Sequence, residues 1–124
     1  KKKKKKKKNK KFFFFEPEDS AVISGSNPGQ HQIQGIGAGF IPKNLNLKII
    51  DRVLSISNNS AFSYARMLAK FEGIAGGISS GAVLSAAVEI NEEISMRNKK
   101  TVIILPSFAE RYLSTALFSE IPNE

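Results

Sequence analysis

The sequence predicts a small α/β domain, and three observations support this fold class. Segments with strand character alternate along the chain with segments of helical periodicity. The β-branched run at 101–105 ends at Pro106, which is typical of a parallel strand covered on both faces. A length of 124 residues with 41% hydrophobic residues allows one domain with a core. We therefore expect short parallel strands flanked by helices.

The positive charge of the chain is confined to its first residues. The formal net charge is +8, from 19 Lys and Arg against 11 Asp and Glu, but ten of the first eleven residues are lysines. From Phe12 onward the chain carries nine basic and eleven acidic residues, a net charge of −2. A domain that binds nucleic acid keeps its positive charge in the folded part, which this chain does not. No apolar run in the sequence approaches the roughly 20 residues of a membrane span. We expect neither nucleic acid nor membrane as a partner.

Residues 1–15 form a separate low-complexity segment, in which the lysines are followed by four phenylalanines at 12–15. Because like charges repel, we expect the lysines to form a disordered, solvated tail. We interpret the segment as artefactual, since an A-rich tract followed by a T-rich tract encodes lysines and then phenylalanines. The alternative is a real arm for nucleic acid or acidic lipid. If the four phenylalanines have replaced the end of a genuine strand, we expect them to pack as a strand in its place.

Two features of the composition exclude classes of site. The chain has no cysteine, which excludes disulfides, thiolate metal sites and cysteine nucleophiles. Its single histidine, His31, cannot form a histidine-rich metal cluster by itself. We therefore assign no metal ligand.

The segment 16–42 is expected to be mostly loop, because it is rich in Pro, Gly, Ser, Asp and Asn. Gly35, Gly37 and Gly39 alternate before Pro42, a spacing that differs from the G-x-G-x-x-G fingerprint of dinucleotide-binding folds. Glycines this dense let the backbone turn sharply or approach another group closely. The residues alone leave two interpretations open: a backbone wall against a ligand, and a tight buried loop.

Two helices are expected in the middle of the chain. Capping residues at 57–60 introduce a helix over 58–72, whose apolar residues recur at three- and four-residue intervals and which ends at Gly73. A second helix begins at 79–81 and runs through Ile90. Its surface is small and apolar on more than one side, so we expect it to be buried.

Shorter elements complete the alternating pattern. We expect a helical turn at 45–50 and short strands at 53–56 and 74–78. The run at 101–105 is the clearest strand, because it is β-branched and ends at a proline. The segment 107–118 is expected to hold a turn and a last helix.

Three motifs follow one another along the chain after position 32. They are Ile-Gln-Gly-Ile-Gly-Ala-Gly-Phe-Ile-Pro at 33–42, Gly-Ile-Ser-Ser-Gly-Ala at 77–82, and Leu-Pro-Ser at 105–107 with Glu-Arg-Tyr-Leu-Ser-Thr at 110–115. In order and spacing they resemble the C-terminal part of cysteine synthase (O-acetylserine sulfhydrylase), a family of fold-type II pyridoxal-phosphate enzymes. The resemblance covers about 16–121 and is weaker to cystathionine β-synthase.

The resemblance implies that residues 16–124 are the C-terminal portion of an enzyme with two α/β domains. Such an enzyme binds pyridoxal 5'-phosphate and makes cysteine by β-replacement, in which sulfide takes the place of the acetate of O-acetylserine. It is expected to be a homodimer and to bind serine acetyltransferase. We expect it in the cytoplasm, with plastid and mitochondrion as alternatives because a targeting segment would lie upstream. The alternative function is a non-catalytic module that docks on a full-length subunit or on serine acetyltransferase.

The resemblance also implies contacts to the cofactor. Ser79 is similar to the family serine whose hydroxyl hydrogen-bonds the pyridine nitrogen of pyridoxal phosphate. From the residues alone, the favoured interpretation is that Ser79 or Ser80 is only a helix N-cap; with the resemblance, we favour the cofactor contact. Pro106 and Ser107 are similar to a strand-end position near the cofactor ring, and ligands of open α/β sheets gather at strand carboxyl ends.

Gly35, Ile36 and Gly37 are similar to the loop that lines the substrate cleft of the family. The Schiff-base lysine and the phosphate loop of the family have no match here, so we assign no catalytic residue and expect the chain to be inactive alone. Ala109 stands where the family has glycine. If that position needs a positive φ, alanine costs on the order of 1 kcal/mol.

Overall fold

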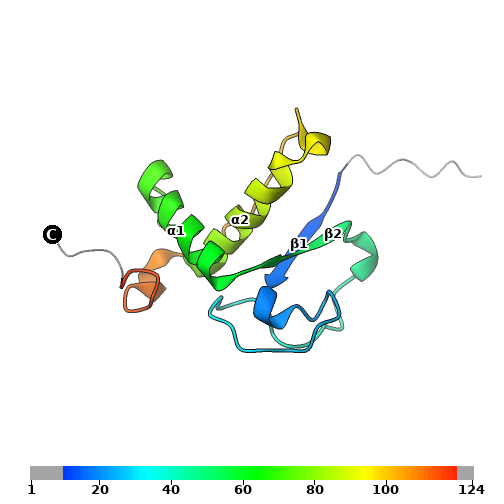
Figure 1. Cartoon of the computed structure of the whole chain (residues 1–124), viewed down its shortest axis with the longest axis horizontal. Helices are drawn as coiled ribbons and strands as arrows, with labels where there is room; N and C mark the ends of the chain where they lie inside the picture. The colour runs from blue at the N-terminus through cyan, green and yellow to red at the C-terminus, as the bar shows by residue number, and fades with distance from the viewer. Residues whose placement is uncertain (1–9, 120–124) are drawn as a thin grey trace, which may run out of the picture.

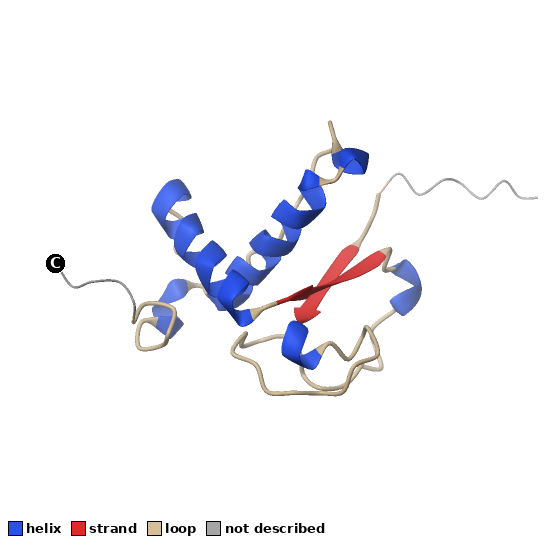
Figure 2. Ribbon diagram, viewed as in Figure 1, coloured by secondary structure: helices blue, strands red, loops and turns tan. Residues whose placement is uncertain are grey.

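A computed structural model describes residues 10–119 of the chain, so most of the expected lysine tail lies outside the described residues. Its strands and helices, in order, are β1 (Phe13–Pro17), β2 (Arg52–Ile56), α1 (Asn58–Glu72) and α2 (Ile78–Glu92). The 3₁₀ helices are Glu18–Ser20, Leu47–Ile49, Ile94–Met96 and Ala109–Tyr112. The two strands lie side by side next to the two long helices. The long loop that connects β1 to β2 passes beneath the strands in this view (Figures 1 and 2). The predicted α/β class is confirmed.

The two strands pair in parallel, with Phe13 opposite Arg52 and Pro17 opposite Ile56. The strand expected at 53–56 is therefore confirmed. The phenylalanines also pack as a strand, and the side chains of Phe13 and Phe15 contact the buried core. Part of the low-complexity segment thus takes part in the fold.

Helix α1 begins and ends where the sequence predicts, because local residues fix both ends. The Ser57 hydroxyl accepts a hydrogen bond from the Ser60 N–H at 3.1 Å, which satisfies a free donor of the first turn. Gly73 has a φ of 66° at the other end, a left-handed conformation that glycine adopts without steric cost. Buried Ala61, Ala65 and Leu68 form the face that packs inward.

Helix α2 is buried along most of its length, as its small apolar surface predicts. Its N-cap is Gly77, and no side chain caps the helix. The interpretation of Ser79 as a helix cap is therefore wrong, since Ser79 lies inside the first turn. Neither this helix nor any other in the described range is long and apolar enough to cross a membrane.

The two helices approach closely at Gly81. A Cβ atom at this position would lie 2.0 Å from the carbonyl oxygen of Ala61 and 2.6 Å from the nitrogen of Ala65. Both neighbours are backbone atoms of α1, so they cannot move aside as a flexible side chain can.

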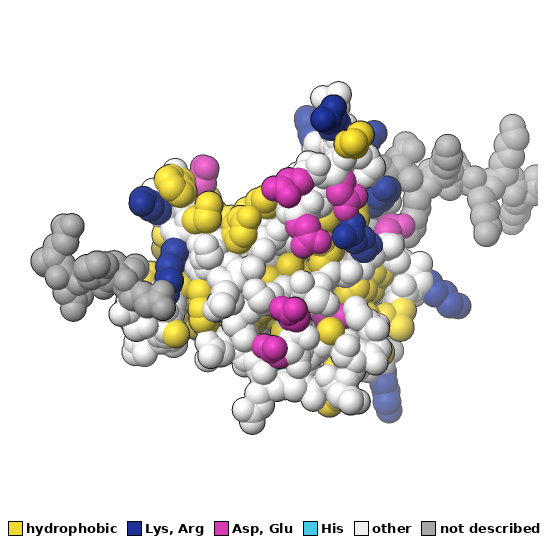
Figure 3. Space-filling model, in the orientation of Figure 1, with side chains coloured by type: hydrophobic (Ala, Val, Ile, Leu, Met, Phe, Trp, Pro, Cys, Tyr) yellow, Lys and Arg dark blue, Asp and Glu magenta, His cyan; other side chains and the backbone are white. Residues whose placement is uncertain are grey.

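Hydrophobic side chains gather along α1 and between the helices, and acidic ones over α2, on the face seen in Figure 3.

Two strand predictions are wrong. The segment 101–105 forms no strand, because no neighbouring strand is present in residues 10–119 to pair with it. The segment 74–78 forms only one antiparallel bridge, between Gly76 and Phe108, before α2 begins. Both errors arise because strand formation needs a partner in space, which a local pattern does not specify.

The prediction of a helix within 107–118 is also wrong, because this segment forms only one 3₁₀ turn, at Ala109–Tyr112. The Tyr112 carbonyl accepts from the Thr115 N–H at 3.0 Å and from the Thr115 hydroxyl at 2.6 Å, so the chain makes a tight turn here in place of a continuing α-helix. Ala109 is not strained, since among the described non-glycine residues only Asn98 has a positive φ. The predicted cost of alanine at position 109 therefore does not arise.

Glu16, at the end of β1, is a buried carboxylate that holds the following loop. It is 3% exposed and accepts hydrogen bonds from the backbone N–H groups of Ile23 at 2.8 Å and Ser24 at 3.0 Å. The Ser24 hydroxyl also donates to this carboxylate, at 2.5 Å. We expect Glu16→Ala to lower the free energy of unfolding by about 3 kcal/mol, because three charge-assisted hydrogen bonds are lost. Urea denaturation measures the change. The exposed neighbour Glu18→Ala is the control, and an equal loss in both variants contradicts the prediction.

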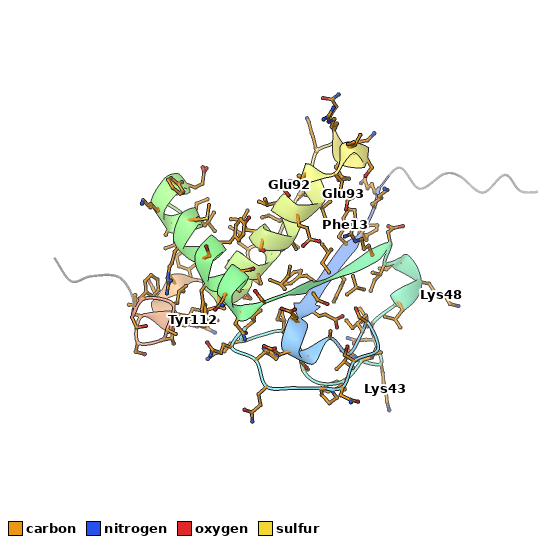
Figure 4. All side chains as sticks on the ribbon, viewed as in Figure 1. Phe13, Lys43, Lys48, Glu92, Glu93 and Tyr112 are labelled. Carbon is orange, nitrogen blue, oxygen red and sulfur yellow. The ribbon has the colours of Figure 1, made fainter. Side chains whose placement is uncertain are left out.

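Arg52 of β2 forms ion pairs with Glu89 and Glu93 at the end of α2, and Glu93 lies near Phe13 in Figure 4. The hydrogen bond from Arg52 lowers the pKa of Glu93 below its ordinary value of 4.5. Because the folded pKa is the lower one, the pair stabilises the fold above pH 4.5 and this contribution is lost as the pH falls through the folded pKa.

We therefore expect Glu93→Gln to lower the thermal midpoint slightly at neutral pH and low salt. The pair is exposed, so added salt screens it. The difference from the unchanged chain disappears at high salt and at a pH below the folded pKa. Thermal unfolding followed by circular dichroism checks this, and a difference that persists in acid contradicts it.

Candidate functional site

A cavity of about 420 Å³ lies where α2 begins. Its size is that of a small-molecule site. Three segments that are distant in sequence line it: the start of α2, the glycine-rich loop and the segment after position 104. The lining residues are Gln34, Gly35, Ile36, Ser79, Leu105, Pro106, Ser107, Phe108, Arg111 and Tyr112.

The Ser79 hydroxyl is held at the wall of this cavity. Ser79 is 3% exposed, and its Oγ lies 2.7 Å from the Oγ of Ser107. A hydroxyl can donate one hydrogen bond and accept two. The bond to Ser107 therefore leaves Ser79 able to make a further hydrogen bond to a group in the cavity.

Ser107 is fixed in turn by the first turn of α2. The Ser80 hydroxyl donates to the Ser107 carbonyl at 2.8 Å and accepts from the Ser107 N–H at 3.2 Å. The Gly77 N–H also donates to the Ser107 carbonyl, at 2.9 Å. These bonds attach the segment around Ser107, with Pro106, to the helix end. The structure thus brings together Ser79, Pro106 and Ser107, which the sequence assigns to one site.

The glycine-rich loop divides between two roles. Gly35 and Ile36 line the cavity with Ser79, and a Cβ atom at Gly35 would meet nothing within 4 Å. Gly37 does not line this cavity. A Cβ atom there would lie 2.5 Å from Pro17 and 2.6 Å from His31. Gly35 therefore lies at the wall of this cavity and Gly37 in a tightly packed turn, while contact of the loop with a ligand stays a prediction.

A second cavity, of about 760 Å³, shares the lining residues Gly35 and Ile36 with the first. Gly37 lines it together with the phenylalanines of β1 and other apolar side chains. The Ser20 hydroxyl also lines it, is buried, and has no hydrogen-bond partner among the described residues. None of the residues that the sequence assigns to the cofactor lines this cavity.

Sequence reasoning missed several lining residues of the smaller cavity. The ring of Tyr112 lies so close to Gly77 that a Cβ atom there would be 2.4 Å from Tyr112 Cε2. Figure 4 shows Tyr112 at the end of the molecule where α2 begins. The two glycines just before α2, Gly76 and Gly77, were the feature of the sequence that indicated a close approach of another group at this point. Gln34 and Arg111 lie within the motifs at 33–42 and 110–115, but the sequence assigned neither to the site, because their distance from Ser79 in sequence hides their proximity in space.

The lining residues restrict the chemistry of the cavity. None of them is a lysine, a histidine or a carboxylate. Figure 4 places Lys43 and Lys48 on the opposite side of the molecule from Tyr112. The lining therefore offers neutral hydroxyl and backbone groups and the Arg111 side chain, but no lysine amine for a covalent bond and no carboxylate base.

Comparisons with known proteins show the family of the chain. The family described as pyridoxal-phosphate dependent enzyme matches residues 1–107. Cysteine synthase A of Escherichia coli strain K12 is 54% identical over 115 residues, which are 88% of this chain and 36% of that protein.

Two solved structures from Entamoeba histolytica have the same fold. Its cysteine synthase is 44% identical with a TM-score of 0.89, over 95% of this chain and 35% of that one. Its O-acetyl serine sulfhydrylase isoform 3 is 41% identical with a TM-score of 0.90, over the same shares of the two chains. The chain spans about a third of the length of these relatives. It belongs to the pyridoxal-phosphate-dependent enzyme family and resembles the C-terminal part of the cysteine synthases.

Proposed function

We propose that this chain is the C-terminal third of a cysteine synthase, which converts O-acetylserine and sulfide to cysteine and acetate. The observation that carries the proposal is the buried Ser79 hydroxyl at the cavity wall, beside the backbone of Gly35. We extend the proposal to the complete enzyme as a homodimer that also binds serine acetyltransferase.

Ser79 is proposed to hydrogen-bond the pyridine nitrogen of pyridoxal phosphate. When bound, the cofactor supplies an electron-accepting ring for elimination and β-addition at the substrate. A neutral hydroxyl does not keep the ring nitrogen protonated, so the ring accepts electrons more weakly than beside a carboxylate. This weaker acceptance favours β-replacement over transamination.

The residues around Ser79 fit such a ring. The volume of about 420 Å³ is large enough for a small aromatic ring, Tyr112 is among the lining residues, and Ser107 orients the Ser79 hydroxyl through the 2.7 Å contact. Gly35 leaves open space where a side chain would project, which supports its predicted place, with Ile36, on the substrate side. Gly37 instead supports the loop by packing on Pro17 and His31.

The chain by itself is expected to form no specific covalent bond with pyridoxal phosphate. The lining of the Ser79 cavity has no lysine, and catalysis in this family needs a lysine that holds the cofactor covalently. After incubation with pyridoxal phosphate and borohydride reduction, peptide mass spectrometry should find no single preferred lysine. Stoichiometric modification of one lysine, such as Lys43, contradicts this expectation.

The proposed function is tested in a single-chain chimaera, in which residues 10–119 replace the matching part of Escherichia coli cysteine synthase A. We expect the chimaera to bind pyridoxal phosphate and to make cysteine from O-acetylserine and sulfide. The 124-residue chain is the control and should make none. A folded chimaera that binds the cofactor but makes no cysteine contradicts the proposal.

A further inference from the structure

The segment 112–118, drawn in orange and red in Figure 1, is bound to α1 by one arginine. Arg66 of α1 donates a hydrogen bond from Nε to the Leu117 carbonyl at 2.7 Å. A terminal nitrogen of the same guanidinium donates to the Ala116 carbonyl at 2.8 Å. A guanidinium presents its donors in a rigid, planar fork, so bonds to two successive peptide groups fix the direction of the backbone as well as its position.

The other hydrogen bonds of this segment are local. Among the described residues, the N–H and the hydroxyl of Thr115 donate to the Tyr112 carbonyl, and two N–H groups that follow donate back to Thr115. These bonds close turns within the segment but do not attach it to another element. The backbone of the segment is therefore held to α1 by Arg66, beside the buried side chains of Tyr112 and Leu117.

The segment begins at a wall of the Ser79 cavity. Tyr112 is 5% exposed and lines this cavity, and its ring packs directly on Gly77, two positions before Ser79. A shift of the ring therefore changes the space next to the Ser79 hydroxyl. Arg66 itself lines neither of the two cavities, so it acts on this space only through the segment that it holds.

We propose that Arg66 is a positioning residue of the cofactor site. By binding the carbonyls of Ala116 and Leu117, it keeps the Tyr112 ring against Gly77 and so sets the width of the Ser79 cavity. Without the guanidinium, the turn is free to move away from α1, and the ring moves with it. The inference rests on the proposed function where it concerns pyridoxal phosphate, whereas the attachment of Tyr112 is a property of the chain itself.

The first test uses the 124-residue chain with 3-fluorotyrosine in place of tyrosine. The chain has two tyrosines, Tyr64 and Tyr112, so fluorine-19 NMR gives two signals, and Tyr112→Phe assigns them. We expect the Tyr112 signal to shift toward that of the unfolded chain in Arg66→Met, which keeps the apolar stem but has no donor. In Arg66→Lys the shift should be smaller, because lysine keeps the charge but lacks the planar fork.

Arg97→Met, in the segment after α2, is the matched control and should leave the Tyr112 signal unchanged. A Tyr112 signal that does not move in the folded Arg66 variants overturns the inference. The conservative Arg66→Lys decides if Arg66→Met does not fold.

The second test measures pyridoxal phosphate binding to the chimaera by fluorescence titration. We expect Arg66→Met to weaken binding about fivefold, within the range of a single net hydrogen bond, with partial rescue in Arg66→Lys. Ile90→Val, which removes a buried methyl group at the far end of α2, lowers stability but should leave the affinity unchanged. An equal loss of affinity in Ile90→Val shows a general effect of stability and contradicts a positioning role.

A double variant shows whether Arg66 acts through Tyr112. We expect Arg66→Met to add no further loss of affinity in the Tyr112→Leu background, because the ring that it positions is absent. Losses that add contradict this route. An unchanged chimaera that binds no pyridoxal phosphate refutes the proposed function, while the fluorine signal still tests the attachment. A chimaera that binds it equally with arginine, lysine and methionine at position 66 refutes the positioning role alone.

Discussion

Gly81→Ala is expected to lower the free energy of unfolding by about 2 kcal/mol. Alanine favours a helix over glycine by about 1 kcal/mol, but its Cβ would lie 2.0 Å from the Ala61 carbonyl oxygen. The two helices must then separate, and overpacking of this kind costs about 3 kcal/mol. The clash therefore exceeds the gain in helix propensity.

Urea denaturation of the 124-residue chain measures this loss. Ser63→Ala, at an exposed position of α1, is the control and should change stability by less than about 0.5 kcal/mol. Gly81→Leu should prevent folding, because a larger side chain has no space between the helices. Unchanged or increased stability of Gly81→Ala contradicts the close packing of α1 on α2.

Ser79→Ala is expected to weaken pyridoxal phosphate binding to the chimaera about tenfold, the effect of one lost hydrogen bond with a buried partner. The structure should persist, because Ser80 and Gly77 still hold the Ser107 carbonyl. Fluorescence titration with pyridoxal phosphate measures the affinity. Ser95→Ala, in the 3₁₀ helix after α2, is the control with full affinity, and an equal affinity of Ser79→Ala removes the proposed contact.

The sequence predicts features that are fixed by neighbouring residues. The ends of α1 follow from Ser57 and Gly73, which act within one turn of the helix. The place of Ser79 at the start of α2 follows from the Gly-Ile-Ser-Ser-Gly motif. The conformation of 101–105 is not predictable in the same way. The segment forms no strand, because strand pairing needs a neighbouring strand that residues 10–119 do not provide.

The cavity itself depends on contacts between distant residues. Tyr112 packs on Gly77 across 35 positions, and Gln34 reaches the same cavity from another loop. A local sequence pattern does not specify contacts between distant residues. The motifs can therefore be recognised in the sequence, but the other residues that line the cavity with them cannot. The buried Glu16 carboxylate was missed for the same reason, since its partners follow seven and eight positions later in an irregular loop.

The protonation of the cofactor's ring nitrogen tests the role of Ser79 most directly. Nitrogen-15 NMR of the chimaera loaded with ring-labelled pyridoxal phosphate reports this state. We predict an unprotonated, hydrogen-bonded nitrogen with Ser79 and a protonated nitrogen in Ser79→Asp, because only a carboxylate stabilises the ring cation. A nitrogen signal that is the same with serine, alanine and aspartate at position 79 contradicts the account.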